Sequence, residues 1–220
     1  MESEYPLREL LERLPKLEVC REEIYRVFQE WIACFQDGGK LMICGNGGSQ
    51  ADSLHIVGEL MKSFERKRAL DSVFSDRLER LFPGDNLPGR LQTPLRALAL
   101  GTNPVLTTAI SNDVSPEMIF AQEVYGYGEC GDVLFALSTS GNSVNVLNAV
   151  KVAKAMGIRC IGMCGGTGGE LKRLCDLCIV IPEEETYLIQ EAMLPVYHSL
   201  CRMVEGYCFP EGRAEKRDEE

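Results

Sequence analysis

The 220-residue sequence has no uninterrupted apolar run of about 18 residues, the length that a membrane-spanning helix needs. It is also short of positive charge, because 23 Lys and Arg stand against 33 Asp and Glu, for a formal net charge of −10. A general nucleic-acid binder needs a basic footprint for phosphates, so this composition argues against one. Residues 1–4 are acidic where a secretory signal is basic. We therefore expect a soluble, cytoplasmic protein with neither a membrane nor a nucleic-acid partner.

Complete nucleotide-binding fingerprints are also lacking. The glycine-rich stretch 45–49 begins Gly45-x-Gly47, but Gln50 occupies the third glycine position of a dinucleotide fingerprint. The stretch 165–169 fails in the same way, with Leu171 at that position, and neither stretch has the Lys-Ser/Thr ending of a P-loop. The sequence therefore predicts no nucleotide cofactor, which disfavours a dehydrogenase or a kinase.

The ten cysteines mostly lie inside apolar runs, which indicates buried structural thiols rather than a disulfide framework. Cys160, Cys164, Cys175 and Cys178 could be combined into a four-thiolate zinc site. However, the Cys175-x-x-Cys178 pair continues directly into an apolar run and lacks the glycine-containing knuckle usual in such sites. We therefore disfavour a structural zinc there.

Short apolar runs separated by helical stretches recur along the chain. Runs without polar alternation are typical of parallel strands covered on both faces. The pattern predicts a single α/β domain with a doubly wound, open, parallel five-stranded sheet flanked by helices. The expected strands are 40–44, 95–100, 132–137, 158–163 and 177–181.

Two helices are expected in residues 1–38, ahead of the main domain at 39–208. The second carries a wide apolar stripe, which must pack either against the chain's own core or against a partner subunit. We interpret residues 65–94 as an insertion with a short amphipathic piece, and expect a final helix over about 186–208. The charged tail 209–220 is predicted to be disordered. The stripe consists of Ile24, Val27, Phe28, Trp31, Ile32 and Phe35.

Small polar residues gather where strands lead into helices, at the edge of a parallel sheet that binds ligands. The stretch 138–143 has four hydroxyls in six residues, Ser138, Thr139, Ser140 and Ser143. Together with free backbone N–H groups and the positive end of the next helix, they can hold a phosphate. The alternative is a plain serine-rich turn in which Ser143 is only an N-cap.

Both histidines of the chain fall in expected helices beside these stretches. His55 and Glu59 are four residues apart and therefore share one helix face. That spacing suits two metal ligands or an acid–base pair. His198 lies eight residues after Gln190 in the last helix. The alternative for each is an ordinary surface or core histidine.

At these residues the sequence resembles the sugar isomerase (SIS) domain family, and within it the phosphoheptose isomerase branch. The resemblance covers most of residues 20–205, and the paired CGNGGS and STSGNS loops are its most specific part. It is carried by CGNGGSQADSLHIVGEL (44–60), AISNDVSPEMIFAQEV (109–124), GDVLFALSTSGNSVNVLNAVKVAKAMGI (131–158) and IQEAMLPVYH (189–198).

The resemblance implies a phosphosugar aldose–ketose isomerase of carbohydrate metabolism, acting on sedoheptulose 7-phosphate as a homotetramer with active sites at subunit interfaces. It implies catalysis by Glu59 and His198, and in some members a zinc ion held by His55, Glu59, Gln190 and His198. Substrate contacts are implied for Asn46, Gly47, Ser49, Asn112, Asp113, Ser138, Thr139, Ser140, Ser143 and Gln190.

Three features depart from the family pattern. Family members often have Arg four residues after the glutamate, where this chain has Ser63 with Lys62 beside it. The 65–94 insertion is longer than usual. Pro195 lies between Gln190 and His198 and is expected to kink the last helix.

Aldose–ketose exchange needs a base for the proton α to the carbonyl and an acid or metal for the enediolate. Glu59 suits the base and His198 the proton shuttle between O1 and O2, while zinc would polarise the carbonyl. One alternative is a non-catalytic SIS protein that binds a replication initiator or senses phosphosugars. Such proteins tend to lose the acid–base pair, which this chain keeps. The other alternative is an isomerase for a different phosphosugar.

Overall fold

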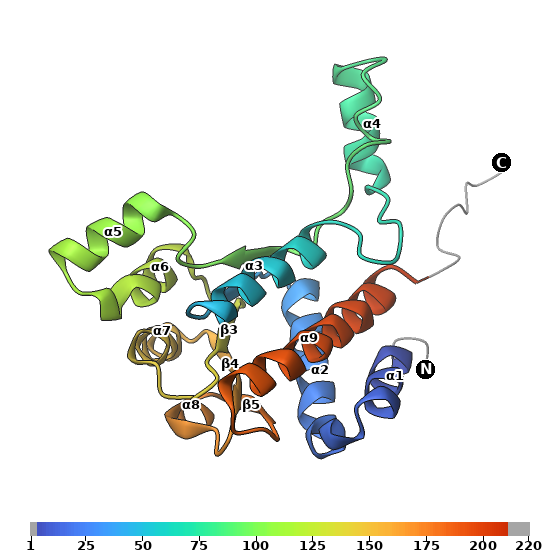
Figure 1. The fold of residues 1–220 in the computed structure, drawn as a ribbon. Helices are drawn as coiled ribbons and strands as arrows, with labels where there is room; N and C mark the ends of the chain where they lie inside the picture. Colours follow the sequence, from blue (N-terminus) through green and yellow to red (C-terminus); the bar gives the residue numbers. More distant parts are fainter. Residues whose placement is uncertain (1–3, 211–220) are drawn as a thin grey trace.

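The computed structural model describes residues 4–210, which form a five-stranded parallel sheet between two layers of helices (Figure 1). The strand order is β2-β1-β3-β4-β5, so the chain starts near the middle and winds outward both ways. This confirms the predicted open, doubly wound α/β sheet, with strand ends shifted by a few residues. The strands are β1 (Leu41–Cys44), β2 (Ala97–Ala99), β3 (Val133–Leu137), β4 (Arg159–Gly165) and β5 (Leu177–Ile181).

Different helices cover the two faces of the sheet. On one face, the N-terminal helices, α3 and α9 bury a large apolar core, and on the other α6, α7 and α8 bury a second one. None of the described helices is both long and apolar enough to cross a membrane. The helices are α1 (Tyr5–Arg13), η2 (Pro15–Cys20), α2 (Arg21–Gln36), α3 (Gly48–Met61), α4 (Ser72–Leu81), α5 (Pro104–Asp113), η3 (Pro116–Met118), α6 (Ile119–Tyr127), α7 (Val144–Ala155), α8 (Gly169–Leu174) and α9 (Thr186–Cys208).

The apolar stripe of α2 packs inside this chain. Trp31 has no exposed surface and makes an edge-on contact with Phe135 of β3, with ring centroids 5.2 Å apart. The rest of the stripe is buried as well, except for the half-buried Phe35. The stripe therefore provides no argument for a partner subunit, because the chain's own core already covers it.

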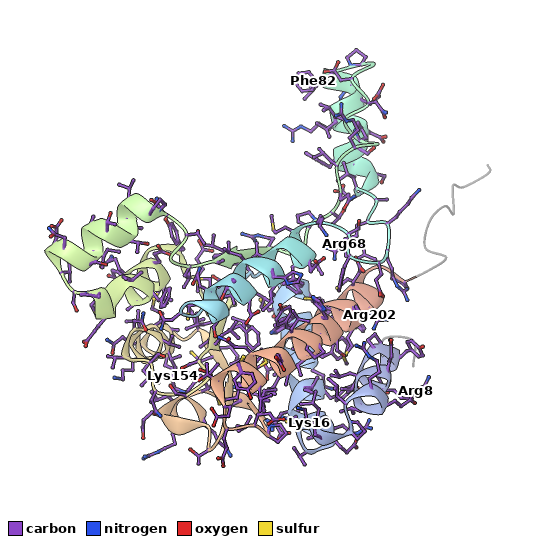
Figure 2. The ribbon with its side chains drawn as sticks, in the orientation of Figure 1. Arg8, Lys16, Arg68, Phe82, Lys154 and Arg202 are labelled. Carbon is purple, nitrogen blue, oxygen red and sulfur yellow. The ribbon has the colours of Figure 1, made fainter. Side chains whose placement is uncertain are left out.

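The insertion contains α4, which stands away from the body of the molecule (Figure 1). Asp71 caps it by accepting a hydrogen bond from the Phe74 N–H at 2.9 Å. None of the residues of α4 is buried, and Val73 is 79% exposed. Phe82, just beyond the helix, lies at its far end (Figure 2). The amphipathic piece predicted here is thus a helix, but it contributes nothing to either core.

A fully buried ion pair ties the segment after α3 to α9. The Arg68 guanidinium donates to Glu205 at 2.8 Å, and both side chains are at most 1% exposed. Glu205 also accepts from the backbone N–H groups of residues 64, 65 and 66. Arg68 in turn donates to the carbonyls of Glu59 and Leu60, the last turn of α3. This pair fixes the end of the helix that carries Glu59.

The last helix has the bounds that the sequence predicts and continues through Pro195.

Most of the ten thiols are buried or half-buried, as expected, and only Cys130 is exposed. Residues 211–220, most of the predicted tail, lie outside the described part of the chain.

Candidate active site

The hydroxyl-rich loop 138–143 and the glycine-rich loops 45–49 and 165–169 meet at the carboxyl edge of the sheet. Gly141 has φ +66°, and a Cβ there would lie 2.1 Å from the carbonyl oxygen of Gly168. Two of the loops therefore touch through backbone that admits no side chain. The third loop, at the start of α3, contacts the last helix, because a Cβ on Gly48 would lie 2.5 Å from Gln190 Nε2.

The hydroxyl-rich loop 138–143 runs from β3 to the N-terminus of α7. Ser138 Oγ and Ser143 Oγ are 3.0 Å apart, and Ser143 makes no side-chain cap to its own helix. Ser140 Oγ accepts from the Asn142 N–H at 3.2 Å. The hydroxyls thus lie at the positive end of a helix, an arrangement that suits a phosphate better than a simple capped turn.

Two asparagines join this loop to the first one. Asn46 and Asn145 exchange amide hydrogen bonds of 2.9 and 2.8 Å between the 45–49 loop and the start of α7. Asn145 was not among the predicted site residues, although it lies only two residues after Ser143. Gly47 has φ +55° and precedes α3, and Ser49 is buried in the first turn.

The predicted sugar contacts Asn112 and Asp113 are at the end of α5, which lies at one side of the molecule (Figure 1). Both are exposed, and Asn112 Nδ2 donates to Asp113 Oδ1 at 2.8 Å. The structure does not show them in contact with the loops, so their role stays a prediction.

The predicted acid–base residues converge from α3 and α9. His55 Nε2 is 3.3 Å from Glu59 Oε1 and 3.3 Å from His198 Nε2. Lys62 Nζ donates to Glu59 Oε2 at 3.1 Å. The Glu59 side chain is 13% exposed and the His55 side chain is 41% exposed. The carboxylate is therefore largely shielded from water, while the imidazole reaches the surface. Burial and the neighbouring His55 lower the pKa of His198, which favours its neutral form.

Two similar proteins and one solved structure carry the same name, phosphoheptose isomerase. Residues 105–203 match the family described as the SIS domain. Phosphoheptose isomerase from Rhodospirillum rubrum is 40% identical over 173 residues, or 79% of each chain. The one from Nitratiruptor is 37% identical over 202 residues, which span 90% of this chain and 95% of the relative. The solved structure of phosphoheptose isomerase from Neisseria gonorrhoeae covers 93% of this chain with TM-score 0.70 and 28% identity.

The chain belongs to the phosphoheptose isomerase family. The resemblance found in the sequence is thereby confirmed, as are the SIS-type fold and the assignment to the aldose–ketose isomerases. Because these relatives are enzymes, the comparisons favour catalysis over the non-catalytic alternative.

Three of the four residues in the zinc set inferred from the phosphoheptose isomerase resemblance lie together, namely His55, Glu59 and His198, but Gln190 lies apart from them. Gln190 contacts Gly48, which is seven residues and about 10 Å along α3 from His55. Within residues 4–210, no group of three or more His, Cys, Asp or Glu side chains is arranged to hold a metal ion. Zinc is therefore not confirmed by the structure, and it stays a prediction from the resemblance.

Two further polar residues adjoin the cluster and were missed from the sequence. Tyr197 Oη lies 3.0 Å from His55 Nδ1 and 3.2 Å from Asp52 Oδ1. Tyr197 is fully buried and Asp52 half-buried. Burial raises the pKa of both groups above their ordinary values. A signal was available, because Asp52 lies one helical turn before His55 on the same face.

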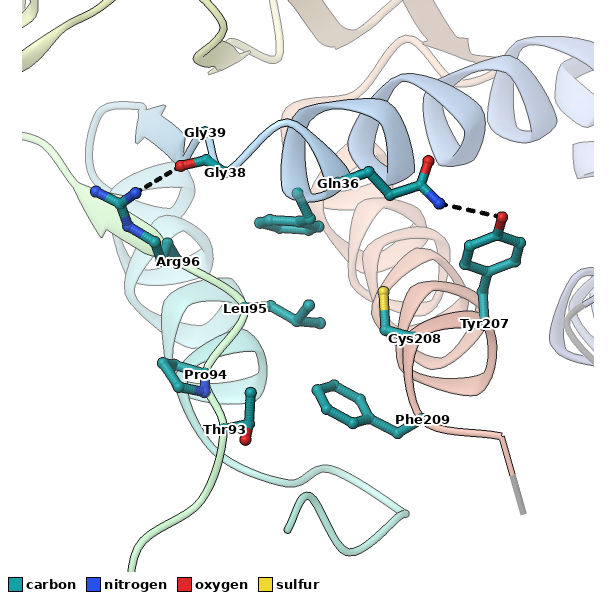
Figure 3. Close-up of a pocket in the computed structure, with 11 residues that line it drawn as sticks. Gln36, Gly38, Gly39, Thr93, Pro94, Leu95, Arg96, Tyr207, Cys208 and Phe209 are labelled. Carbon is teal, nitrogen blue, oxygen red and sulfur yellow. Dashed lines mark hydrogen bonds between the residues drawn. The ribbon is translucent and has the colours of Figure 1, made fainter. Parts of the chain in front are cut away.

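A cavity of about 350 Å³ lies at the C-terminal end of α9 (Figure 3). It is lined by the end of α2, residues 93–96 and residues 207–209, and contains none of the predicted site residues. A site chosen by its cavity alone would therefore miss the polar cluster of His55, Glu59 and His198.

Proposed function

We propose that this chain interconverts sedoheptulose 7-phosphate and a heptose 7-phosphate aldose through an enediolate. The observation that carries the proposal is the convergence of Glu59 and His198 on His55, each 3.3 Å from its Nε2 atom. A carboxylate and an imidazole so placed suit proton removal α to a carbonyl and proton movement between the neighbouring oxygens.

In this proposal the loop 138–143 binds the phosphate, with Ser138, Thr139, Ser140 and Ser143 donating to its oxygens. Glu59 takes the proton from the carbon beside the ketone and returns it to the neighbouring carbon. His198, neutral because its pKa is lowered, moves a proton between O1 and O2. Asn46, Gly47, Ser49, Asn112, Asp113 and Gln190 are proposed to contact the sugar.

A homotetramer with active sites between subunits is part of the proposal. Along α3, Gly48, in the loop joined to the start of α7, and His55 of the acid–base cluster are about 10 Å apart. The two parts could serve one substrate within a chain, or each could be completed by a neighbouring copy. The resemblance favours the second arrangement, and we propose that the enzyme acts in the cytoplasm.

Zinc stays a prediction from the resemblance. His55, Glu59 and His198 offer two imidazoles and a carboxylate, which are donors that zinc accepts. When bound, zinc would polarise the carbonyl group of the sugar substrate. Gln190 would have to leave Gly48 to join them.

The test is to incubate the purified chain with a panel of ketose phosphates and measure aldose formation. We expect turnover of sedoheptulose 7-phosphate, with Glu59→Gln strongly impaired and Glu191→Gln, an exposed glutamate of α9, unimpaired. Conversion of a shorter ketose phosphate in preference would support the isomerase for another phosphosugar. No conversion of any panel member, with or without added zinc, would refute the proposal.

A further inference from the structure

A short series of hydrogen bonds supports the side of His55 that faces away from Glu59. It runs from Asp52 Oδ1 to Tyr197 Oη at 3.2 Å and from Tyr197 Oη to His55 Nδ1 at 3.0 Å. Tyr197 has no exposed surface, and its ring meets the imidazole nearly edge-on at 76°. Its hydroxyl is therefore confined to these two polar partners among the contacts that the structure shows.

The single proton of the tyrosine hydroxyl decides how this series is ordered. An ionised Asp52 only accepts hydrogen bonds, so Tyr197 Oη–H donates to it. The phenol oxygen is then left to accept, and the hydrogen bond with His55 needs a proton on Nδ1. A neutral imidazole with Nδ1 protonated has a bare lone pair on Nε2.

We propose that Asp52 and Tyr197 are positioning residues that hold His55 in the Nδ1–H tautomer, with Nε2 unprotonated toward Glu59 and His198. The inference deepens the proposed isomerase function and rests on it. In the opposite tautomer, Nε2–H would donate to Glu59 Oε1 across the 3.3 Å that separates them. A carboxylate that accepts one more hydrogen bond is a weaker base. The series therefore keeps one oxygen of the proposed base free to take the substrate proton.

The chain is well suited to a direct test, because it contains only two histidines. With ¹⁵N-labelled histidine, NMR distinguishes protonated from bare ring nitrogens, and a His198→Asn sample assigns the signals of His55. The spectra are recorded about two pH units above the ordinary histidine pKa of about 6.5, where a free imidazole is neutral. We expect Nδ1 protonated and Nε2 bare for His55 in the wild type.

Two variants then test the two partners. Tyr197→Phe keeps the ring but removes the acceptor, and Asp52→Ala frees the tyrosine hydroxyl to donate to Nδ1. In both we expect His55 to change to the Nε2–H form. The control is Tyr207→Phe, which removes another tyrosine hydroxyl from the same helix. The Tyr207 hydroxyl accepts a hydrogen bond from Gln36 at 3.3 Å, in the cavity of Figure 3. The control variant should leave both histidine spectra and turnover unchanged.

The activity readout is separate from the spectra. Loss of an outer hydrogen-bond partner of a functional histidine commonly costs about 10- to 100-fold, and we expect that loss in kcat with KM little changed. Protonation of Nε2 in the wild type, or Nδ1–H retained in Tyr197→Phe, would overturn the inference. Nδ1–H retained only in Asp52→Ala would overturn the part assigned to Asp52. Absence of isomerase activity in the wild type would refute the function but leave the tautomer measurable.

Discussion

Neutralising Glu205 gives the sharpest test of how the site is held. Glu205→Gln leaves the Arg68 guanidinium charged, fully buried and without its carboxylate. Removing one partner of such a pair costs about 3–5 kcal/mol of unfolding free energy. For a chain of this size each kcal/mol shifts Tm by about 2–4 °C, so we expect a Tm lower by about 6–20 °C.

The measurement is urea and thermal unfolding followed by circular dichroism, beside a surface control. Arg8 and Glu12 form a 4.0 Å pair with side chains 66% and 73% exposed, so Glu12→Gln should stay within about 1 kcal/mol of the wild type. A Glu205→Gln variant as stable as Glu12→Gln would refute the reasoning.

Removing both charges together tests the detail of the anchor. Arg68→Met with Glu205→Leu eliminates the unpaired charge, so we expect part of the stability to return. Recovery should be incomplete, because three backbone N–H groups and the carbonyls of Glu59 and Leu60 lose their partners. Each unsatisfied buried group costs about 1–3 kcal/mol. Full recovery would show that these backbone bonds contribute nothing.

Four other outcomes are expected. Glu59→Gln and His198→Asn should each lower turnover by about 10²–10⁴-fold, and the double variant should lose far less than the product, which steady-state kinetics will measure. Gly141→Ala should raise KM and lower stability by more than about 1 kcal/mol, because its Cβ would collide with Gly168 at a positive φ; unchanged binding of the sugar phosphate would contradict this. Since the folded-state pKa of His198 is below 6.5, the unfolded chain binds the proton more readily, so unfolding free energy should fall as pH drops through 6.5, and less steeply in His198→Asn. If zinc takes part, dialysis against a chelator should reduce turnover and added zinc restore it, with metal content followed by elemental analysis; unchanged turnover of metal-free protein would show that Glu59 and His198 suffice.

Local patterns predicted those features that depend on neighbours in the sequence. Strands such as Val133–Leu137 are buried at every position, so their apolar runs alone identify them. The placement of His55 and Glu59 on one helix face followed from spacing in the same way. The stripe on α2 was recognised as buried, but what covers it could not be, because periodicity does not name the partner surface.

Contacts between distant residues were not predictable from these patterns. Arg68 and Glu205 are 137 residues apart, and each looks like an ordinary charged surface residue in its own segment. Tyr197 reads as one more apolar position of α9 until the fold brings it to Asp52. The separation of Gln190 from His55 also appeared only once the two helices were placed side by side, since spacing within one helix does not fix the register against another.

Because the first helices pack against the last one, part of the core cannot form until nearly the whole chain has been synthesised. The apolar residues of α1 and α2 share a core with α9, and Arg202 near its end pairs with Glu9 at 2.7 Å. After Gln36 is made, 172 more residues must follow before Cys208 completes that helix. At about 5–20 residues per second this takes about 10–35 s, during which the α2 stripe has no α9 to cover it. The nascent chain is therefore a candidate for chaperone binding through its first 36 residues, and truncations that stop before α9 should aggregate.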